Sequence, residues 1–300
     1  MRKRLIAVCA LTALAAVSAQ AAGGLAWTED AAKAMATAAR EGKDLLINFT
    51  GSDWCGWCIR LDKEVFAQAA FVAEAPKSFV FLKLDFPRQR PMPEAVKKQN
   101  AEWQARFRIT GYPTIILADA SGKPYARTGY QAGGPEKYLE SLAALRKVRT
   151  TRDEAFEKAK AAEGIEKAKL LDAALSGIEA QLVLGNYADV MAEIVKLDPA
   201  NEAGLKNKYG ALAALPAIEA AANGKNPDEA LALADDALKT YGATGSVAQD
   251  ILFLKSLVLY RKGDKAGAKA GLEAALAAAP AGPKAQQIKA ILDRAFKDVK

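Results

Sequence analysis

Cys55 and Cys58 are the residues whose type and spacing most directly permit chemistry, because a C-x-x-C pair can cycle between two thiols and a disulfide. The chain has three cysteines, and the third, Cys9, lies in an apolar stretch near the N-terminus. Zinc is the usual alternative for this spacing, but structural zinc takes four ligands, mostly Cys and His, and the chain contains no His. A purely structural Cys55–Cys58 disulfide would close a very short loop and constrain the unfolded chain little. Redox chemistry is therefore the favoured interpretation.

Cys55 is expected to be the sulfur that attacks. An apolar run at 45–49 predicts a buried strand, residues 51–54 form a turn, and a helix is predicted to begin near Cys55. Unpaired N–H groups and the dipole at a helix N-terminus stabilise a thiolate, so the pKa of Cys55 should lie below that of a free thiol. Cys58 lies one helical turn later and should face the sheet until it attacks a mixed disulfide.

The elements expected to hold this pair alternate between helix and strand. Gly42 is expected to end the first helix, and Ser121-Gly122 is expected to form a hairpin turn. Helices are predicted at 28–40, from about 55 onward, from after 93 to about 107, and at 135–147. Strands are predicted at 45–49, 79–85, 114–117 and 125–127. Parallel strands followed by a hairpin predict an α/β fold, with a mixed sheet and helices on both faces.

Two motifs on these elements resemble the thioredoxin superfamily. The run 54–58, Trp-Cys-Gly-Trp-Cys, follows an apolar strand, and the run 111–114, Gly-Tyr-Pro-Thr, precedes another. The resemblance covers about residues 25–149. The run Asp85-Phe86-Pro87, the helix predicted after residue 93 and the segment 130–138 look most like an exported bacterial branch of the superfamily. It implies a thioredoxin-like α/β fold and a thiol-disulfide oxidoreductase that acts on protein disulfides.

The resemblance also implies roles for individual residues. Cys55 corresponds to the attacking cysteine and Cys58 to the buried resolving one, while Pro113 matches the family's cis-proline that faces the disulfide. A cis bond there would leave the backbone of Tyr112 free to pair with an extended substrate strand. A trans proline that simply starts a strand is the alternative.

The predicted substrate surface also includes the residues beside the cysteines. Gly56 lets the backbone turn closely, and the two tryptophans can either present flat apolar surface to a peptide or pack on the sheet. We expect packing for Trp54 and partial exposure for Trp57. The residues assigned to substrate binding are Trp54, Gly56, Trp57, Tyr112 and Pro113.

The sequence leaves the proton acceptor for Cys58 open. Most thioredoxins have a buried carboxylate at about the position of Asn48, whose amide cannot titrate, whereas Lys83 matches the family's lysine partner of that acid. Asp62, at i+4 from Cys58, is a possible substitute, although a solvated helix position is the simpler interpretation. Asn48, Lys83 and Asp62 are therefore supporting residues of the predicted site.

The N-terminus has the three parts of a secretory signal in order. Basic residues at 2–4 precede an apolar run from 5 to about 19, and small residues follow for cleavage near Ala21 or Ala22. An uncleaved membrane anchor and a lipoprotein modified at Cys9 are weaker alternatives. We expect an exported, periplasmic protein. Loss of the leader lowers the formal net charge of +7 by three, and the remaining basic residues are scattered, which argues against a nucleic-acid partner.

The composition changes from residue 150 onward. Cys and Trp vanish, Ala becomes more frequent, and predicted helices alternate with short breaks. In the clearest unit, about 249–282, Leu252, Gly263, Leu272 and Pro280 fall at spacings that resemble a tetratricopeptide repeat. An ordinary helical bundle is the alternative.

A chain of 300 residues has room for two domains. We expect a signal peptide at 1–22, a thioredoxin-like domain at 23–149, and an all-α, tetratricopeptide-like domain at 150–300. The helical domain is expected to bind a protein partner, so its deletion should leave the reduction of a small disulfide nearly intact.

Two functions stay open. The protein is either an enzyme or a helical-repeat binding protein with a vestigial C-x-x-C, and the presence of both cysteines together with Pro113 favours the enzyme. Strong oxidants of this fold often place His between the cysteines, whereas this chain has Gly56-Trp57, so we expect a reductase or isomerase. The expected clients are protein disulfides or thiols. The electron donor is not identified, and no metal, cofactor or nucleic acid is expected.

Overall fold

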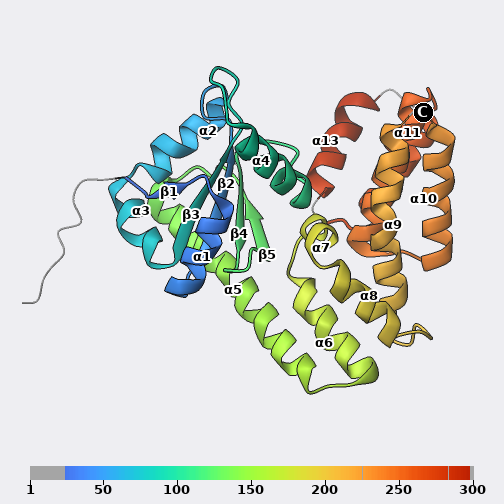
Figure 1. Ribbon diagram of the computed structural model, residues 1–300. Coiled ribbons are helices and arrows are strands. Elements are labelled where there is room, and N and C mark those ends of the chain that lie inside the picture. Colours follow the sequence, from blue (N-terminus) through green and yellow to red (C-terminus); the bar gives the residue numbers. More distant parts are fainter. Residues whose placement is uncertain (1–23, 225, 283, 298–300) are drawn as a thin grey trace, which may run out of the picture.

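The computed structural model describes residues 24–224, 226–282 and 284–297, so the predicted signal peptide and Cys9 lie outside the described residues. The chain forms an α/β half built on one sheet, followed by an all-helical half (Figure 1). This arrangement confirms the predicted fold class. In the described ranges, no helix is both long and apolar enough to cross a membrane.

One mixed sheet of five strands, in the order β1-β3-β2-β4-β5, organises the first half. The strands are β1 (Trp27–Thr28), β2 (Asp44–Thr50), β3 (Phe79–Asp85), β4 (Thr114–Ala118) and β5 (Pro124–Thr128). β1, β3 and β2 run parallel, whereas β4 is antiparallel to both β2 and β5. Every residue of β2 is buried, as its apolar run predicts for a strand covered on both faces. The prediction missed β1, which is too short to show a periodic pattern.

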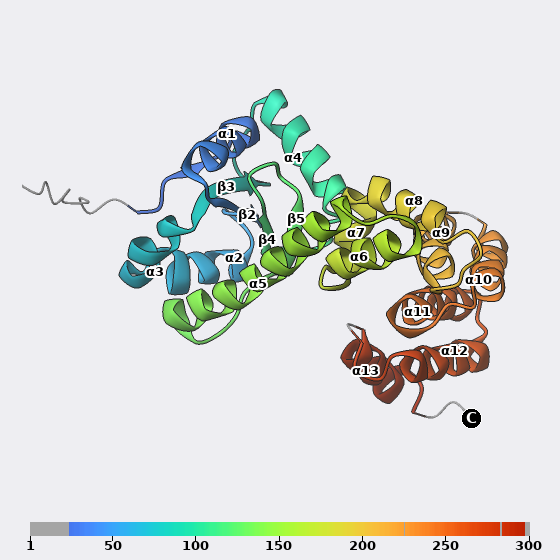
Figure 2. The ribbon, with the colours of Figure 1, turned by 90° about the horizontal axis from the view of Figure 1, so that it is seen from below.

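Helices cover both faces of this sheet (Figure 2). α1 (Ala31–Glu41) and α4 (Glu94–Arg106) pack on one face. α2 (Gly56–Leu61), α3 (Ala69–Glu74) and α5 (Gly134–Lys160) pack on the other. Both layers are needed because the strands of the sheet are apolar on both sides.

The boundaries of α1 and α2 follow from local hydrogen bonds. α1 begins after Asp30 and not after Thr28 as predicted, because the Asp30 carboxylate accepts the N–H of Lys33 at 2.9 Å. Gly42 ends α1 in the left-handed conformation, as predicted. α2 continues into a π-helical turn at Asp62–Phe66.

α5 is longer than predicted. Residues 136–160 contain neither Gly nor Pro, so nothing ends the helix at about 147, and it runs for 27 residues to Lys160. Position 149/150, where the composition places the predicted domain boundary, lies inside this helix. The division into domains stays a prediction.

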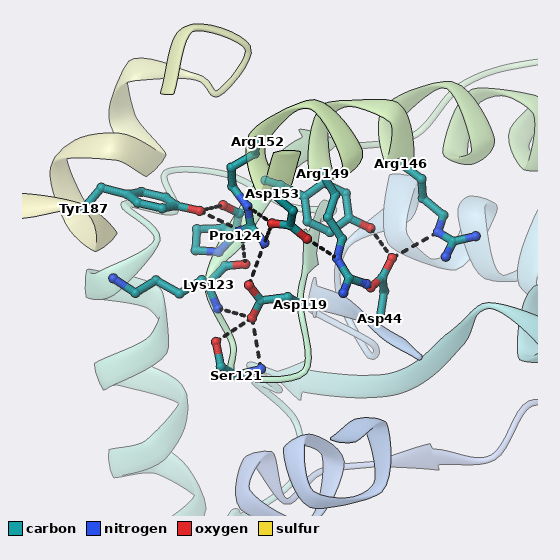
Figure 3. Close-up of polar contacts among 11 residues, drawn as sticks. Asp44, Asp119, Ser121, Lys123, Pro124, Arg146, Arg149, Arg152, Asp153 and Tyr187 are labelled. Carbon is teal, nitrogen blue, oxygen red and sulfur yellow. Dashed lines mark hydrogen bonds and ion pairs between the residues drawn. The ribbon is translucent and has the colours of Figure 1, made fainter. Parts of the chain in front are cut away.

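Charged residues along α5 connect it to the sheet (Figure 3). Asp44, which is fully buried at the start of β2, accepts hydrogen bonds from Arg146 at 3.0 Å, from Arg149, and from the Tyr125 hydroxyl at 2.9 Å. A buried carboxylate is tolerated only with such partners, so these contacts fix the position of α5 on the sheet.

Arg152 connects α5 to the helical half. Its side chain is 4% exposed and donates to Asp119 at 2.8 Å and to the Tyr187 hydroxyl at 2.9 Å. The Tyr187 hydroxyl in turn donates to the Pro124 carbonyl at 2.6 Å (Figure 3). One buried guanidinium thus links α5, the β4–β5 hairpin and Tyr187 of the helical half.

The helical half consists of helices joined by short loops. Its helices are α6 (Gly164–Ser176), α7 (Ala180–Asn186), α8 (Ala188–Leu197), α9 (Leu205–Asn223), α10 (Pro227–Tyr241), α11 (Gly245–Arg261), α12 (Lys265–Ala278) and α13 (Ala285–Ala295). α9 packs on α10, and α11 packs on α12. In the predicted repeat unit, Gly263 turns the chain between α11 and α12, and Leu272 is buried. The assignment to tetratricopeptide repeats stays a prediction.

The two halves share one hydrophobic core. The cluster that contains Phe107 and Ile109 of the first half also contains Leu182 and Tyr187 of the second. At Gly185 the backbones approach so closely that a Cβ atom would overlap the carbonyl oxygen of the α4 residue Arg106. The Arg106 guanidinium also donates to the side chain of Asn186 at 2.7 Å. The helical half is therefore packed directly against the α/β half.

Candidate active site

Cys55 and Cys58 form a disulfide at the start of α2. Cys55 is the N-cap residue, and its sulfur accepts the N–H of Cys58 at 3.2 Å. The prediction of a helix starting at Cys55 is thus confirmed. The exposed fraction of Cys55 is 7%, close to the 5% of Cys58, so both sulfur-bearing side chains are nearly buried. The exposed neighbours Gly56 and Trp57 leave the disulfide at the rim of the molecule.

Two carboxylates hold the turn before Cys55. Asp85, at the end of β3, accepts the N–H of Ser52 at 2.9 Å and its hydroxyl at 2.6 Å. Asp53 accepts the N–H groups of Arg88 at 3.0 Å and Gln89 at 2.8 Å. The bond from Arg88 is the main cause that lowers the pKa of Asp53, so Asp53 is ionised at neutral pH. These bonds attach the turn to the segment after β3.

The second predicted motif also has the expected backbone. The Tyr112–Pro113 peptide bond is cis, which confirms that prediction. The Tyr112 ring lies 5.8 Å from the Trp54 ring, edge to face, and 5.2 Å from the Phe86 ring. Gln104 donates to the Tyr112 hydroxyl at 2.7 Å, and burial raises the pKa of this hydroxyl. The contact between Trp54 and Tyr112 joins the two motifs.

The two tryptophans behave as expected. Trp54 is half-buried, and its indole N–H donates to the Phe86 carbonyl at 2.8 Å. Trp57 is 57% exposed, and its ring lies 5.1 Å from the ring of Tyr130. An exposed aromatic ring that is held on one side is suited to contact an apolar group of a partner.

A charged cluster supports the ring of Trp57. The Arg60 guanidinium lies 5.4 Å from the Trp57 ring and 5.2 Å from the Tyr130 ring. Glu64 accepts from Arg60 at 2.7 Å and from the Tyr130 hydroxyl at 2.6 Å, and the latter bond is the main cause that lowers the pKa of Glu64. Arg60 is thus neutralised by Glu64.

Asn48 and Lys83 lie side by side in the sheet, below α2. They are directly paired between β2 and β3, and Asn48 shares its sheet face with Leu46, which packs with Leu61 of α2. Asn48 is buried, and its side-chain oxygen has no hydrogen-bond partner in the part of the chain that the structure describes. Asp62 is exposed, as the simpler interpretation of the sequence expected. The proton-accepting roles of these residues stay predictions.

An Asn48→Asp substitution is expected to introduce a new titration. Burial raises the pKa of a carboxyl group, so the folded variant should hold its proton above the pH at which the unfolded chain loses it. Its stability should therefore be highest at low pH and fall as pH rises, by roughly 1–3 kcal/mol at pH 8. A plot of the turnover rate against pH should show one additional inflection, caused by the new carboxyl group.

Denaturant unfolding at pH 5 and pH 8, with turnover measured from pH 5 to 9, checks this expectation. Asp62→Asn is the matched control, because an exposed residue without a role should change neither curve. A shift of the pH profile in Asp62→Asn, with none in Asn48→Asp, would instead identify Asp62 as the proton acceptor.

Comparison with known proteins identifies the family. A family model described as a thioredoxin-like domain matches residues 31–146. The disulfide bond reductase DsbH of Chlamydia pneumoniae is 33% identical over 129 residues, which are 43% of this chain and 77% of DsbH. The chain belongs to the thioredoxin superfamily. Within it, the likeness to Dsb proteins, together with the Cys55–Cys58 disulfide, makes this chain a thiol-disulfide oxidoreductase.

Two further matches also cover less than half of this chain. The thioredoxin-related protein DsbJ of Chlamydia pneumoniae is 29% identical over 105 residues, which are 35% of this chain and 30% of DsbJ. A solved structure of a DsbH oxidoreductase has 31% sequence identity and a TM-score of 0.40, and the match covers 42% of this chain and 86% of that one. The family match at 31–146 lies within the α/β half.

Sequence reasoning missed several residues that shape the site. Asp85 and Asp53 fix the turn before Cys55, and Glu64 and Tyr130 hold Arg60 beside Trp57. Most of these contacts join residues 33 to 66 positions apart, so no local sequence pattern predicts them. The run Asp85-Phe86-Pro87, which is part of the resemblance to the exported branch, is the one signal that pointed to this segment.

Proposed function

We propose that this protein reduces disulfide bonds in other exported proteins, with Cys55 as the attacking thiolate and Cys58 as the resolving thiol. The observation that carries the proposal is the position of Cys55 at the N-cap of α2, where its sulfur accepts a backbone N–H. In the reduced protein such a donor favours the thiolate, which is the nucleophile in thiol-disulfide exchange.

The reaction proceeds in two exchanges. The Cys55 thiolate attacks one sulfur of a client disulfide, forms a mixed disulfide, and releases the other client sulfur as a thiolate that takes up a proton. Cys58 then loses its proton and attacks the sulfur of Cys55, which releases the second client thiol. The client gains two electrons and two protons, and the protein is left with the Cys55–Cys58 disulfide. A donor of two electrons must restore the dithiol.

Two observations favour reduction over oxidation. The residues between the cysteines are Gly56 and Trp57, so no histidine stands there to stabilise the reduced form as in strong oxidants. The relative with 33% identity is itself called a disulfide bond reductase. The exposed ring of Trp57 and the backbone at Tyr112 and Pro113 would contact the client.

The reduction potential tests the direction of electron flow. We expect the Cys55–Cys58 couple to equilibrate with glutathione at a potential nearer about −270 mV, as in thioredoxin, than about −120 mV, as in a strong oxidant. The fraction of reduced protein can be measured by thiol alkylation across a series of glutathione ratios. A potential near −120 mV would contradict a reductase.

We propose further that the protein acts in the periplasm after removal of residues 1–22, and that its helical half binds a protein partner. The sequence of the N-terminus supports the first proposal. The exposed apolar side chains of Leu257 and Tyr260 on α11 support the second. The alternative is a helical-repeat binding protein in which the C-x-x-C is vestigial. Such a protein would show no Cys55-dependent turnover of insulin disulfides.

A further inference from the structure

Arg88 lies at the edge of the active site. It follows β3, and its guanidinium lies over the ring of Trp54, 3.7 Å from the ring centroid. Trp54 immediately precedes Cys55 in the chain. A guanidinium at this distance from an indole makes a cation–π contact, so the charge of Arg88 is held over the ring of the residue that precedes the attacking cysteine.

Both partners of this contact are fixed by other bonds. The Trp54 indole N–H donates to the Phe86 carbonyl at 2.8 Å, and the Arg88 N–H donates to Asp53 at 3.0 Å. The Asp53 carboxylate accepts the backbone N–H groups of Arg88 and Gln89, and not the guanidinium of Arg88. These bonds fix the backbone of Arg88 and the ring of Trp54, and they do not use the guanidinium of Arg88.

Arg88 differs from Arg60 and Arg90 in the partners of its guanidinium group. Arg60 pairs with Glu64 at 2.7 Å, and Arg90 pairs with Asp85 at 2.6 Å. Among the residues that the structure describes, Arg88 has no carboxylate within ion-pairing distance of its guanidinium. It is also exposed, so an incoming group can reach it.

We propose that Arg88 selects clients with an acidic residue next to the cysteine that is attacked. This inference rests on the proposed function and names the class of client. A client strand that pairs with the backbone at Tyr112 would run beside Trp54, whose ring lies 5.8 Å from the ring of Tyr112. A carboxylate on that strand meets the free N–H edge of the stacked Arg88 guanidinium, which can bind it through two parallel hydrogen bonds.

The test uses the full-length protein, reduced beforehand, and two disulfide-linked peptides that differ only beside the cysteine, one with Glu and one with Lys. Single-turnover reduction can be followed by tryptophan fluorescence. We expect the wild type to reduce the Glu peptide about fivefold to tenfold faster, with the ratio falling as salt rises. Arg88→Ala should bring the ratio close to one, and Arg88→Lys should restore part of it. Lys63→Ala, which removes an exposed charge from the π-helical turn, is the control for net charge and should keep the wild-type ratio.

The outcomes separate this inference from the proposed function. Equal rates for both peptides with the wild type, or an unchanged ratio in Arg88→Ala, would overturn the role of Arg88 and leave the reductase intact. An equal loss for both peptides in Arg88→Ala would also overturn it, because Arg88 would then act on Cys55 and not on the client. If the wild type reduces neither peptide, the proposed function fails, and the inference fails with it.

Discussion

A Cys55→Ser variant is expected to lose at least about a thousandfold in the rate of protein disulfide reduction, a barrier increase of about 4 kcal/mol or more. A serine hydroxyl at the N-cap of α2 can accept the same backbone N–H, but it is not ionised at neutral pH and does not attack a disulfide. Reduction of insulin disulfides, with dithiothreitol as the electron donor, measures this loss.

The melting temperature serves as the control for this variant. Both cysteines are nearly buried in a short loop whose closure stabilises the chain little, so the variant should stay folded. If Cys55→Ser kept a tenth or more of the wild-type rate, the C-x-x-C would be vestigial, and the binding-protein alternative would be favoured.

Deletion of residues 150–300 is expected to destabilise the α/β half and not to leave it intact. The cut divides α5 and removes Arg152, Leu182 and Tyr187, while Phe107 and Ile109 lose part of the core that covers them. Each large apolar side chain taken out of such a core costs roughly 2–5 kcal/mol, which together approach the whole stability of a domain. The rate at which the truncated chain reduces a small disulfide should therefore fall as its folded fraction falls. The sequence alone led us to expect that this rate would stay nearly intact.

Thermal unfolding and reduction of a small aromatic disulfide by the truncated chain check this result. Deletion of residues 262–300 is the matched control. It removes α12 and α13, whose buried residues belong to a separate cluster with Phe253, and should leave the reduction rate close to that of the full chain. A chain of residues 1–149 that melts cooperatively at the wild-type temperature would contradict a shared core.

The sheet and the redox pair could be predicted because their signals are local. The apolar runs of β2 and β3 are interrupted only by Asn48 and Lys83, and Pro113 stands directly before β4, so the four predicted strands were correct to within one residue at each end. The N-cap position of Cys55 follows from the turn that precedes it. These features depend on the spacing of neighbouring residues, which the sequence displays.

The remaining features depend on contacts between distant residues. The length of α5 could have been seen in the absence of Gly and Pro, but the change in composition at 150 suggested a boundary there instead. The shared core between Phe107 and Tyr187, and the stacking of Arg88 on Trp54, join segments that are far apart in the chain. Asn48 was recognised as unusual, yet the sequence could not show that its side-chain oxygen lacks a partner.

Trapping of mixed disulfides tests the assignment of Cys55 as the nucleophile most directly. In Cys58→Ser the resolving thiol is absent, so the disulfide between Cys55 and a client should persist and be recovered as an adduct that dithiothreitol releases. Cys55→Ser should form almost no adduct, because Cys58 lies within α2, whereas Cys55 is the N-cap residue whose sulfur accepts a backbone N–H. Adducts that form in Cys58→Ser and not in Cys55→Ser are the predicted result. Adducts that form through Cys58, or none in either variant, would contradict it.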